Sequence, residues 1–211
     1  SGFRGSAVVS SDRPVNVVGT EVVSGSPYSM FSSYEGVSTP AAVTYVPLVF
    51  NDYSLQWNTR VAIQNTSPTA AATVTIAYYN EAGAEVYRDP NVSIPPNASR
   101  LYDHGDMGSK LGGPQFRGSA VVTSEPVPVA VTIDEYSNTL GKLLSYRGIP
   151  ASDAAKRVYA PLVAKKYSAN WYTNMMIRNV GSSEAHVTIT YRGRGLTGPV
   201  TASYNIATSM M

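Results

Sequence analysis

Hydrophobic and polar side chains alternate with a period of two along most of this chain. In Thr73–Tyr78 and again in Val127–Ile133, small or hydroxyl side chains alternate with larger apolar ones, and β-branched residues are frequent. This alternation is typical of strands with one buried face. No long stretch has the spacing of an amphipathic helix, although Ala151–Ala155 could form a single turn. The pattern predicts an all-β fold.

Glycine and proline interrupt the expected strands at short intervals. Examples are Glu81–Gly83, Ile94–Asn97 and Gly112–Pro114. Because these residues favour turns and do not continue a strand ladder, their spacing predicts antiparallel strands joined by hairpins.

The chain repeats itself. FRGSAVVS at Phe3–Ser10 returns as FRGSAVVT at Phe116–Thr123, displaced by 113 residues. Thr44–Thr66 returns with substitutions as Val158–Val180, displaced by 114 residues. A fixed displacement over such runs indicates two copies of one structural unit. We therefore expect two tandem immunoglobulin-like antiparallel β-sandwich repeats of about 113 residues each.

A repeat has a period but no inherent starting point, so two domain divisions fit the sequence. The first has a β-sandwich at 1–104, a Gly-rich linker or loop at 105–115, and a second β-sandwich at 116–211. In the alternative, 44–148 is one complete sandwich, and residues 158–211 of one chain are completed by residues 1–36 of the next.

Two expected strands near the ends of the chain favour self-association. Ser6–Ser10 and Thr201–Ile206 carry no charged side chain. Natural proteins commonly protect edge strands with charge or proline, because an unprotected edge pairs with another chain. Head-to-tail pairing of this kind does not close on itself and produces a fibre.

Composition narrows the function classes. Charged residues make up 14% of the chain, against about 25% in typical proteins, and 16 basic residues nearly balance 14 acidic ones. The Lys and Arg residues are scattered, which argues against nucleic-acid binding. No apolar run is long enough for membrane insertion. The chain has no cysteine, so cysteine usage does not indicate a redox compartment. The abundance of Ser, Thr, Tyr, Val and Gly leads us to expect a secreted, extracellular or cell-surface protein.

Few residues suit catalysis. His104, beside Asp103 and Asp106, is a candidate metal ligand or acid-base group, although polar loops of this kind are usually only solvated. Ser6 and Ser119 lie in expected strands and not in the sharp turn that exposes a nucleophile. We therefore predict no catalytic, metal or cofactor-binding residue and no enzymatic activity.

Several residues are candidates for binding or modification. Trp57 and Trp171 occupy matching positions in the two copies, where they could pack at a strand entrance or stack on a sugar. Asn65, Asn91 and Asn97 begin N-x-[ST] sequons and are candidate glycosylation sites.

One loop differs in charge between the copies. Asp52 in the first copy corresponds to Lys166 in the second copy, where Lys165 precedes it. Opposite charges on equivalent loops could set the register between repeats, so these three residues are candidate assembly contacts. Sequence drift on a solvated loop is the other interpretation.

The repeated motifs also resemble a family. The resemblance extends over nearly the whole chain, and the runs that carry it are Tyr45–Val49, Trp57–Asn65, Val74–Tyr78, Phe116–Ser124 and Tyr146–Gly148. They are similar to the tandem immunoglobulin-like or fibronectin-like modules of large secreted bacterial surface proteins. The resemblance implies a role in a stalk, adhesin or fibre, and it carries no catalytic residues.

These observations lead to one expected function and one alternative. The expected function is a non-catalytic structural subunit of an extracellular fibre or cell-surface polymer, assembled head to tail with copies of itself. The alternative is a carbohydrate-binding or adhesive surface module that recognises surface glycans through Trp57 and Trp171.

Overall fold

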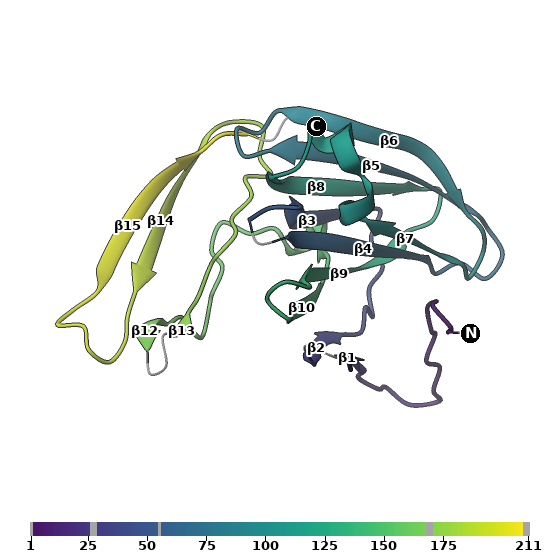
Figure 1. Cartoon of the computed structure of the whole chain (residues 1–211), viewed down its shortest axis with the longest axis horizontal. Coiled ribbons are helices and arrows are strands. Elements are labelled where there is room, and N and C mark those ends of the chain that lie inside the picture. Colours follow the sequence, from purple (N-terminus) through teal and green to yellow (C-terminus); the bar gives the residue numbers. More distant parts are fainter. Residues whose placement is uncertain (1, 26–28, 55, 168–170, 209–211) are drawn as a thin grey trace.

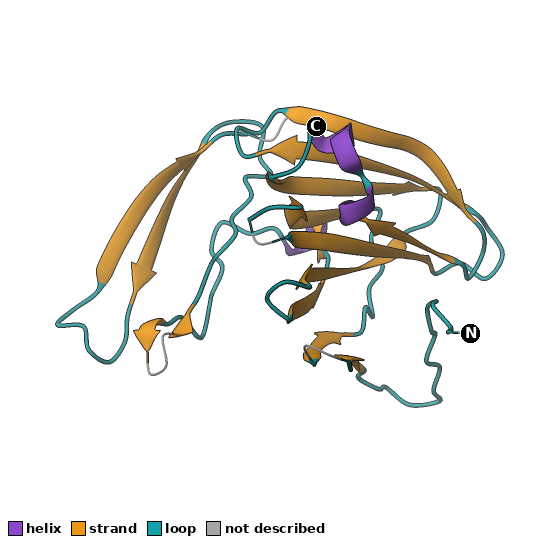
Figure 2. Cartoon of the chain, in the orientation of Figure 1, coloured by secondary structure: helices purple, strands orange, loops and turns teal. Residues whose placement is uncertain are grey.

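The chain folds into several antiparallel sheets, as the computed structural model in Figures 1 and 2 shows. The structure describes residues 2–25, 29–54, 56–167 and 171–208. The all-β prediction is confirmed. In the described part of the chain, helix is limited to short 3-10 turns: η1 (His104–Asp106), η2 (Gly108–Leu111) and η3 (Ala151–Asp153). The last of these lies where the sequence predicts a single turn.

Two larger sheets form the centre of the molecule. One has four strands in the order β10 (Lys142–Arg147), β9 (Val129–Ser137), β4 (Trp57–Asn65) and β7 (Ser99–Asp103). The other has five strands in the order β11 (Ile149–Pro150), β3 (Val43–Asn51), β8 (Phe116–Glu125), β5 (Ala72–Asn80) and β6 (Glu85–Ile94). The strands on either side of residues 105–115 therefore belong to the same two sheets.

One hydrophobic core is built from both sheets. The period-two pattern places every second side chain on the inner face of its strand. Val61 and Ile63 of β4 thus meet Val74 and Ile76 of β5, and all four are fully buried. Val122 of β8, the middle strand of the five-stranded sheet, is equally buried.

Among the described residues, three two-stranded sheets lie outside this core. They are β1 (Val18–Val23) with β2 (Met30–Glu35), β12 (Lys165–Tyr167) with β13 (Trp171–Tyr172), and β14 (Ala185–Tyr191) with β15 (Val200–Ile206). We call residues 2–36 the N-terminal arm and residues 155–208 the C-terminal arm. Residues 2–11 and the β14/β15 hairpin lie at opposite ends of the molecule (Figure 1). No helix of the described residues is long and apolar enough to span a membrane.

Candidate functional site

The N-terminal arm exposes apolar side chains whose sequence counterparts are buried in the centre. Val8 and Val9 are 67% and 59% exposed, whereas their counterparts Val121 and Val122 are 3% and 0% exposed. Phe3 is 90% exposed, against 9% for Phe116. The same seven-residue sequence, FRGSAVV, is therefore a buried strand at one site and an unpaired segment at the other.

The C-terminal arm shows the same contrast. Val187, Ile189 and Tyr191 lie on one face of β14 and are only half-buried. Their counterparts in β5, 113 residues earlier, are fully buried. Along the preceding segment, Tyr159 and Leu162 are exposed. Each arm thus leaves apolar side chains at least partly exposed to solvent.

Local geometry recurs between the C-terminal arm and the centre. The Thr59 hydroxyl accepts a hydrogen bond from the Phe50 amide at 2.8 Å, and the Thr173 hydroxyl accepts one from the Ala164 amide at 3.0 Å. Asp52 and Lys166, at the equivalent turn position, have φ values of 46° and 53°. The arm therefore has the turn conformation of its counterpart without the same burial.

A buried asparagine also recurs. Asn65 is fully buried, and its Nδ2 donates to the carbonyls of Ala70 and Ile94 at 2.8 and 2.9 Å. In the C-terminal arm, Nδ2 of Asn179 donates to the carbonyls of Ser183 and Ile206 at 2.7 and 3.0 Å. Each side chain bridges a loop to the end of a distant strand and so holds a hairpin in place.

Arg178 connects the C-terminal arm to the outer face of the five-stranded sheet. Its guanidinium lies 4.6 Å from the ring centroid of Tyr79 and 5.8 Å from that of Tyr45, and it donates to the Ser119 hydroxyl. Burial lowers the pKa of Arg178. Contacts of a cation with two aromatic faces are favourable and sensitive to geometry, so Arg178 anchors this arm.

The β1/β2 hairpin of the N-terminal arm lies against β10 through charged groups. Arg147 forms an ion pair with Glu35 at 3.6 Å. Burial and the nearby Asp134 carboxylate raise the pKa of Glu21, and burial also raises the pKa of Asp134. Two adjacent carboxyl groups repel each other when both are ionised, so this contact is stronger when one holds a proton.

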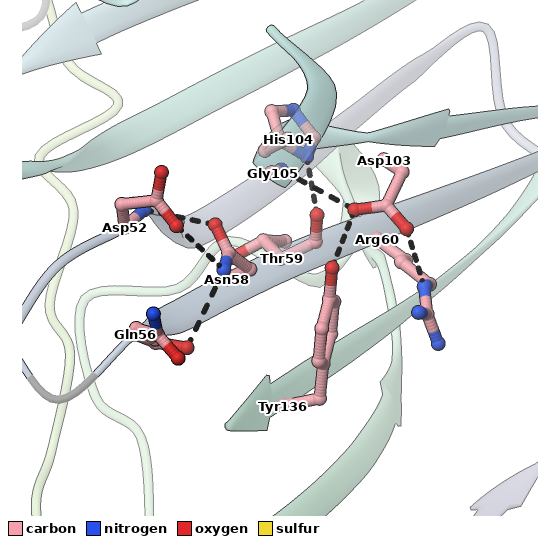
Figure 3. Close-up of polar contacts among 9 residues, drawn as sticks. All are labelled: Asp52, Gln56, Asn58, Thr59, Arg60, Asp103, His104, Gly105 and Tyr136. Carbon is pink, nitrogen blue, oxygen red and sulfur yellow. Dashed lines mark hydrogen bonds and ion pairs between the residues drawn. The ribbon is translucent and has the colours of Figure 1, made fainter. Parts of the chain in front are cut away.

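A polar network occupies the end of the four-stranded sheet (Figure 3). Asp103 accepts hydrogen bonds from Nε of Arg60 at 2.7 Å and from the Tyr136 hydroxyl at 2.6 Å. Burial by itself would raise the pKa of Asp103, but these donors outweigh burial and hold the pKa below its usual value. The Arg60 guanidinium also lies 4.0 Å from the centroid of the Tyr136 ring. The carboxylate therefore ties β4, β7 and β9 together.

His104 is a buried part of this network and not a solvated loop residue. Its Nδ1 lies 2.7 Å from the Thr59 carbonyl oxygen, and its Nε2 lies 3.1 Å from the Tyr78 hydroxyl. Burial lowers the pKa of His104 to about 4, so the ring is neutral at physiological pH. Both nitrogens are engaged within the protein. No group of three or more His, Cys, Asp and Glu side chains able to hold a metal occurs among the described residues.

Glu135 is a buried carboxyl group that the sequence analysis missed. It follows Val129, Val131 and Ile133 at alternate positions of β9, and this spacing could have identified it as inward-facing. The Thr59 hydroxyl donates to its Oε2 at 2.6 Å and the Tyr146 hydroxyl to its Oε1 at 3.0 Å. Burial outweighs these donors and raises the pKa of Glu135 to about 8.

The candidate sugar-binding tryptophan Trp57 belongs to a small aromatic cluster. Its ring centroid lies 6.2 Å from that of Phe50, which stacks on Tyr53 at 5.2 Å. Trp57 is half-buried. Tyr53 lines an open cavity of about 410 Å³ together with polar groups of Glu81, Gln115 and Arg117 among others. The side chain of the second candidate, Trp171, lies outside the described residues.

The candidate glycosylation sites differ in accessibility. Asn91 and Asn97 are exposed, with φ values of 55° and 58°, a conformation that asparagine adopts more readily than most residues. Asn91 lies at a register irregularity within β6, and Asn97 lies in the turn that follows this strand. Asn65, in contrast, uses its Nδ2 for the buried hydrogen bonds described above.

The candidate assembly residues lie on separate parts of the molecule. Asp52 is half-buried, and its carboxylate accepts from Nδ2 of Asn58 at 3.1 Å (Figure 3). Lys165 and Lys166 are exposed on the C-terminal arm. The structure does not bring Asp52 and the two lysines together within one chain.

No family model matches this chain, and no curated protein matches it. Solved structures to which the chain is similar include the following two. Thermotoga maritima 1070 aligns with a TM-score of 0.42 and 19% identity over 53% of this chain and 96% of that one. The Anabaena sensory rhodopsin transducer aligns with a TM-score of 0.36 and 17% identity over 46% of this chain and 97% of that one. Both are distant structural neighbours of an all-β protein.

Proposed function

We propose that this chain is a non-catalytic structural subunit of an extracellular fibre or cell-surface polymer. The C-terminal arm of one copy joins the N-terminal arm of the next, and each joint is an immunoglobulin-like β-sandwich built like the two central sheets. One observation carries the proposal: apolar side chains that are buried in the centre are exposed at the equivalent positions of the N-terminal arm and only half-buried at those of β14 in the C-terminal arm.

The energetics require both arms. Burying Phe3, Val8 and Val9 at about 1.5–3 kcal/mol each would contribute roughly 5–9 kcal/mol. Association costs about 4–15 kcal/mol before any affinity remains. The half-exposed face of β14 and the exposed segment before it must therefore add their own burial for a stable joint.

The titratable groups of the centre support a structural role. The half-buried Asp103 and the buried His104 and Glu135 are hydrogen-bonded to residues of other strands, and these bonds hold the strands together. The low charge content and the abundance of Ser, Thr and Tyr support an extracellular or surface location.

Electron microscopy and sedimentation of the purified chain at neutral pH test this proposal. Regular fibres, or oligomers that grow with concentration, are expected. Val9→Asp should prevent assembly without affecting folding, because Val9 is exposed in the free chain. Val86→Asp is the matched control, since Val86 is also exposed but lies on β6, outside the arms. A chain that stays monomeric at high concentration would refute the proposal.

A carbohydrate-binding or adhesive role is the second candidate. It is favoured by the stacked Phe50 and Tyr53 rings beside the open cavity, because sugars bind to aromatic faces flanked by polar groups. Glycan-array binding that is lost in Trp57→Ala, with unchanged circular dichroism, would support it.

A further inference from the structure

We infer that residues Phe3–Ser11 of one copy act as a donor strand that enters between the 158–164 segment and β14 of a second copy. This inference rests on the proposed function and specifies the position and register of the inserted strand. In the central five-stranded sheet, β8 lies between β3 and β5. Phe3–Ser11 is the counterpart of β8, whereas the 158–164 segment and β14 are the counterparts of its two neighbours.

In the described part of the free chain, β14 is a strand and residues 158–164 are not, and no strand pairs with either of them at the position that β8 occupies in the centre. In the centre, β5 pairs with β6 on one side and with β8 on the other. Its counterpart β14 pairs with β15, as β5 does with β6, but among the named strands it has no second partner. The edge of β14 that corresponds to the β8 side therefore presents backbone groups to an incoming strand.

The free donor segment has matching properties. Residues 2–11 form no strand, and their side chains are exposed. They lie at the opposite end of the molecule from β14 (Figure 1), so the arrangement of the free chain does not place them beside β14 of the same chain. A head-to-tail insertion leaves one free donor and one free acceptor at the ends of every polymer, so growth continues.

The central pairing sets the register of the joint. Ile76 pairs with Val122 and Thr75 with Thr123. Applying the repeat displacement of 113 residues to these central pairs places Ile189 opposite Val9 and Thr188 opposite Ser10. On the other side of the donor, the pairing of Tyr45 with Val121 transfers to Tyr159 opposite Val8. This register buries Val9 beside Ile189 and leaves Ser10 and Thr188 on the outer face.

The register can be tested by disulfide crosslinking, because the chain contains no cysteine. Ser10→Cys with Thr188→Cys places the two Cα atoms about 4.5–5.5 Å apart across the joint, within the range that a disulfide spans. Ser10→Cys with Thr190→Cys is the control, because its diagonal separation of about 7–8 Å is too long. Both pairs replace exposed polar side chains, so folding should be unaffected.

Mild oxidation of the first double variant should produce a ladder of covalent oligomers on denaturing gels, at least tenfold more than the control. A peptide of residues 2–12 should shorten the polymers, and the same peptide with Val9→Asp should not. Polymers that form with equal or stronger crosslinking in the control would overturn this register while leaving the proposed function standing. A crosslinked monomer would overturn donation between copies, and a chain that neither assembles nor crosslinks would overturn both proposals.

Discussion

The buried carboxyl of Glu135 should make stability fall as pH rises near neutrality. In the folded protein its pKa is about 8, against an ordinary value of 4.5. Between these values the folded state holds a proton that the unfolded state has released, so the free energy of unfolding decreases with rising pH. The slope approaches about 1.36 kcal/mol per pH unit.

His104 acts in the opposite direction over a lower range. Its folded pKa of about 4 lies below the ordinary 6.5, so its contribution is lost as pH falls below 6.5. The two effects largely cancel below pH 6.5, and the Glu135 effect is the larger one above it. From pH 6.5 to 8 we expect a net decrease of about 1 kcal/mol in the free energy of unfolding, because the slope falls as pH approaches the folded pKa of Glu135.

Glu135→Gln should remove this decrease, because glutamine does not titrate and still offers an acceptor to Thr59 or Tyr146. The assay is denaturant unfolding followed by tryptophan fluorescence, at a concentration where sedimentation shows monomer. Trp57 reports on the region directly, since it pairs with Ser137 of β9. Glu125→Gln is the control, because Glu125 is exposed. Equal slopes in Glu135→Gln and the unmodified chain would refute the reasoning.

Three further predictions concern packing. Ile76→Ala should lower the free energy of unfolding by about 2–5 kcal/mol, measured by denaturant titration. Ile189→Ala should have a much smaller effect on the unfolding of the monomer but should weaken assembly, measured by sedimentation. Asn65→Ala should cost about 1–3 kcal/mol in the same titration, because buried carbonyls lose their donor. Arg178→Ala should release the C-terminal arm from Tyr79, seen as faster proteolysis of that arm with an unchanged core; equal cleavage rates would contradict this role.

Local sequence was sufficient for the kind of secondary structure. The alternation in Thr73–Tyr78 predicts a strand that the structure contains as part of β5, and Val129–Ile133 lies in β9. The single helical turn after Pro150 is also present. The burial of His104 and Glu135 was not foreseen, because a polar residue is buried only when partners from distant strands, here Thr59, satisfy its hydrogen bonds.

The sequence by itself determined the all-β fold and the repetition, because side-chain alternation and turn residues act over a few positions. Only the tertiary structure decided which copies of the motif share a core. FRGSAVV is buried as part of β8 at Phe116–Val122 and exposed at Phe3–Val9. Identical residues have identical local preferences, so the difference comes from the neighbours that pair with them. β3 and β5 flank β8 in the chain's own sheet, whereas the segment at Phe3–Val9 has no such neighbours within the described chain.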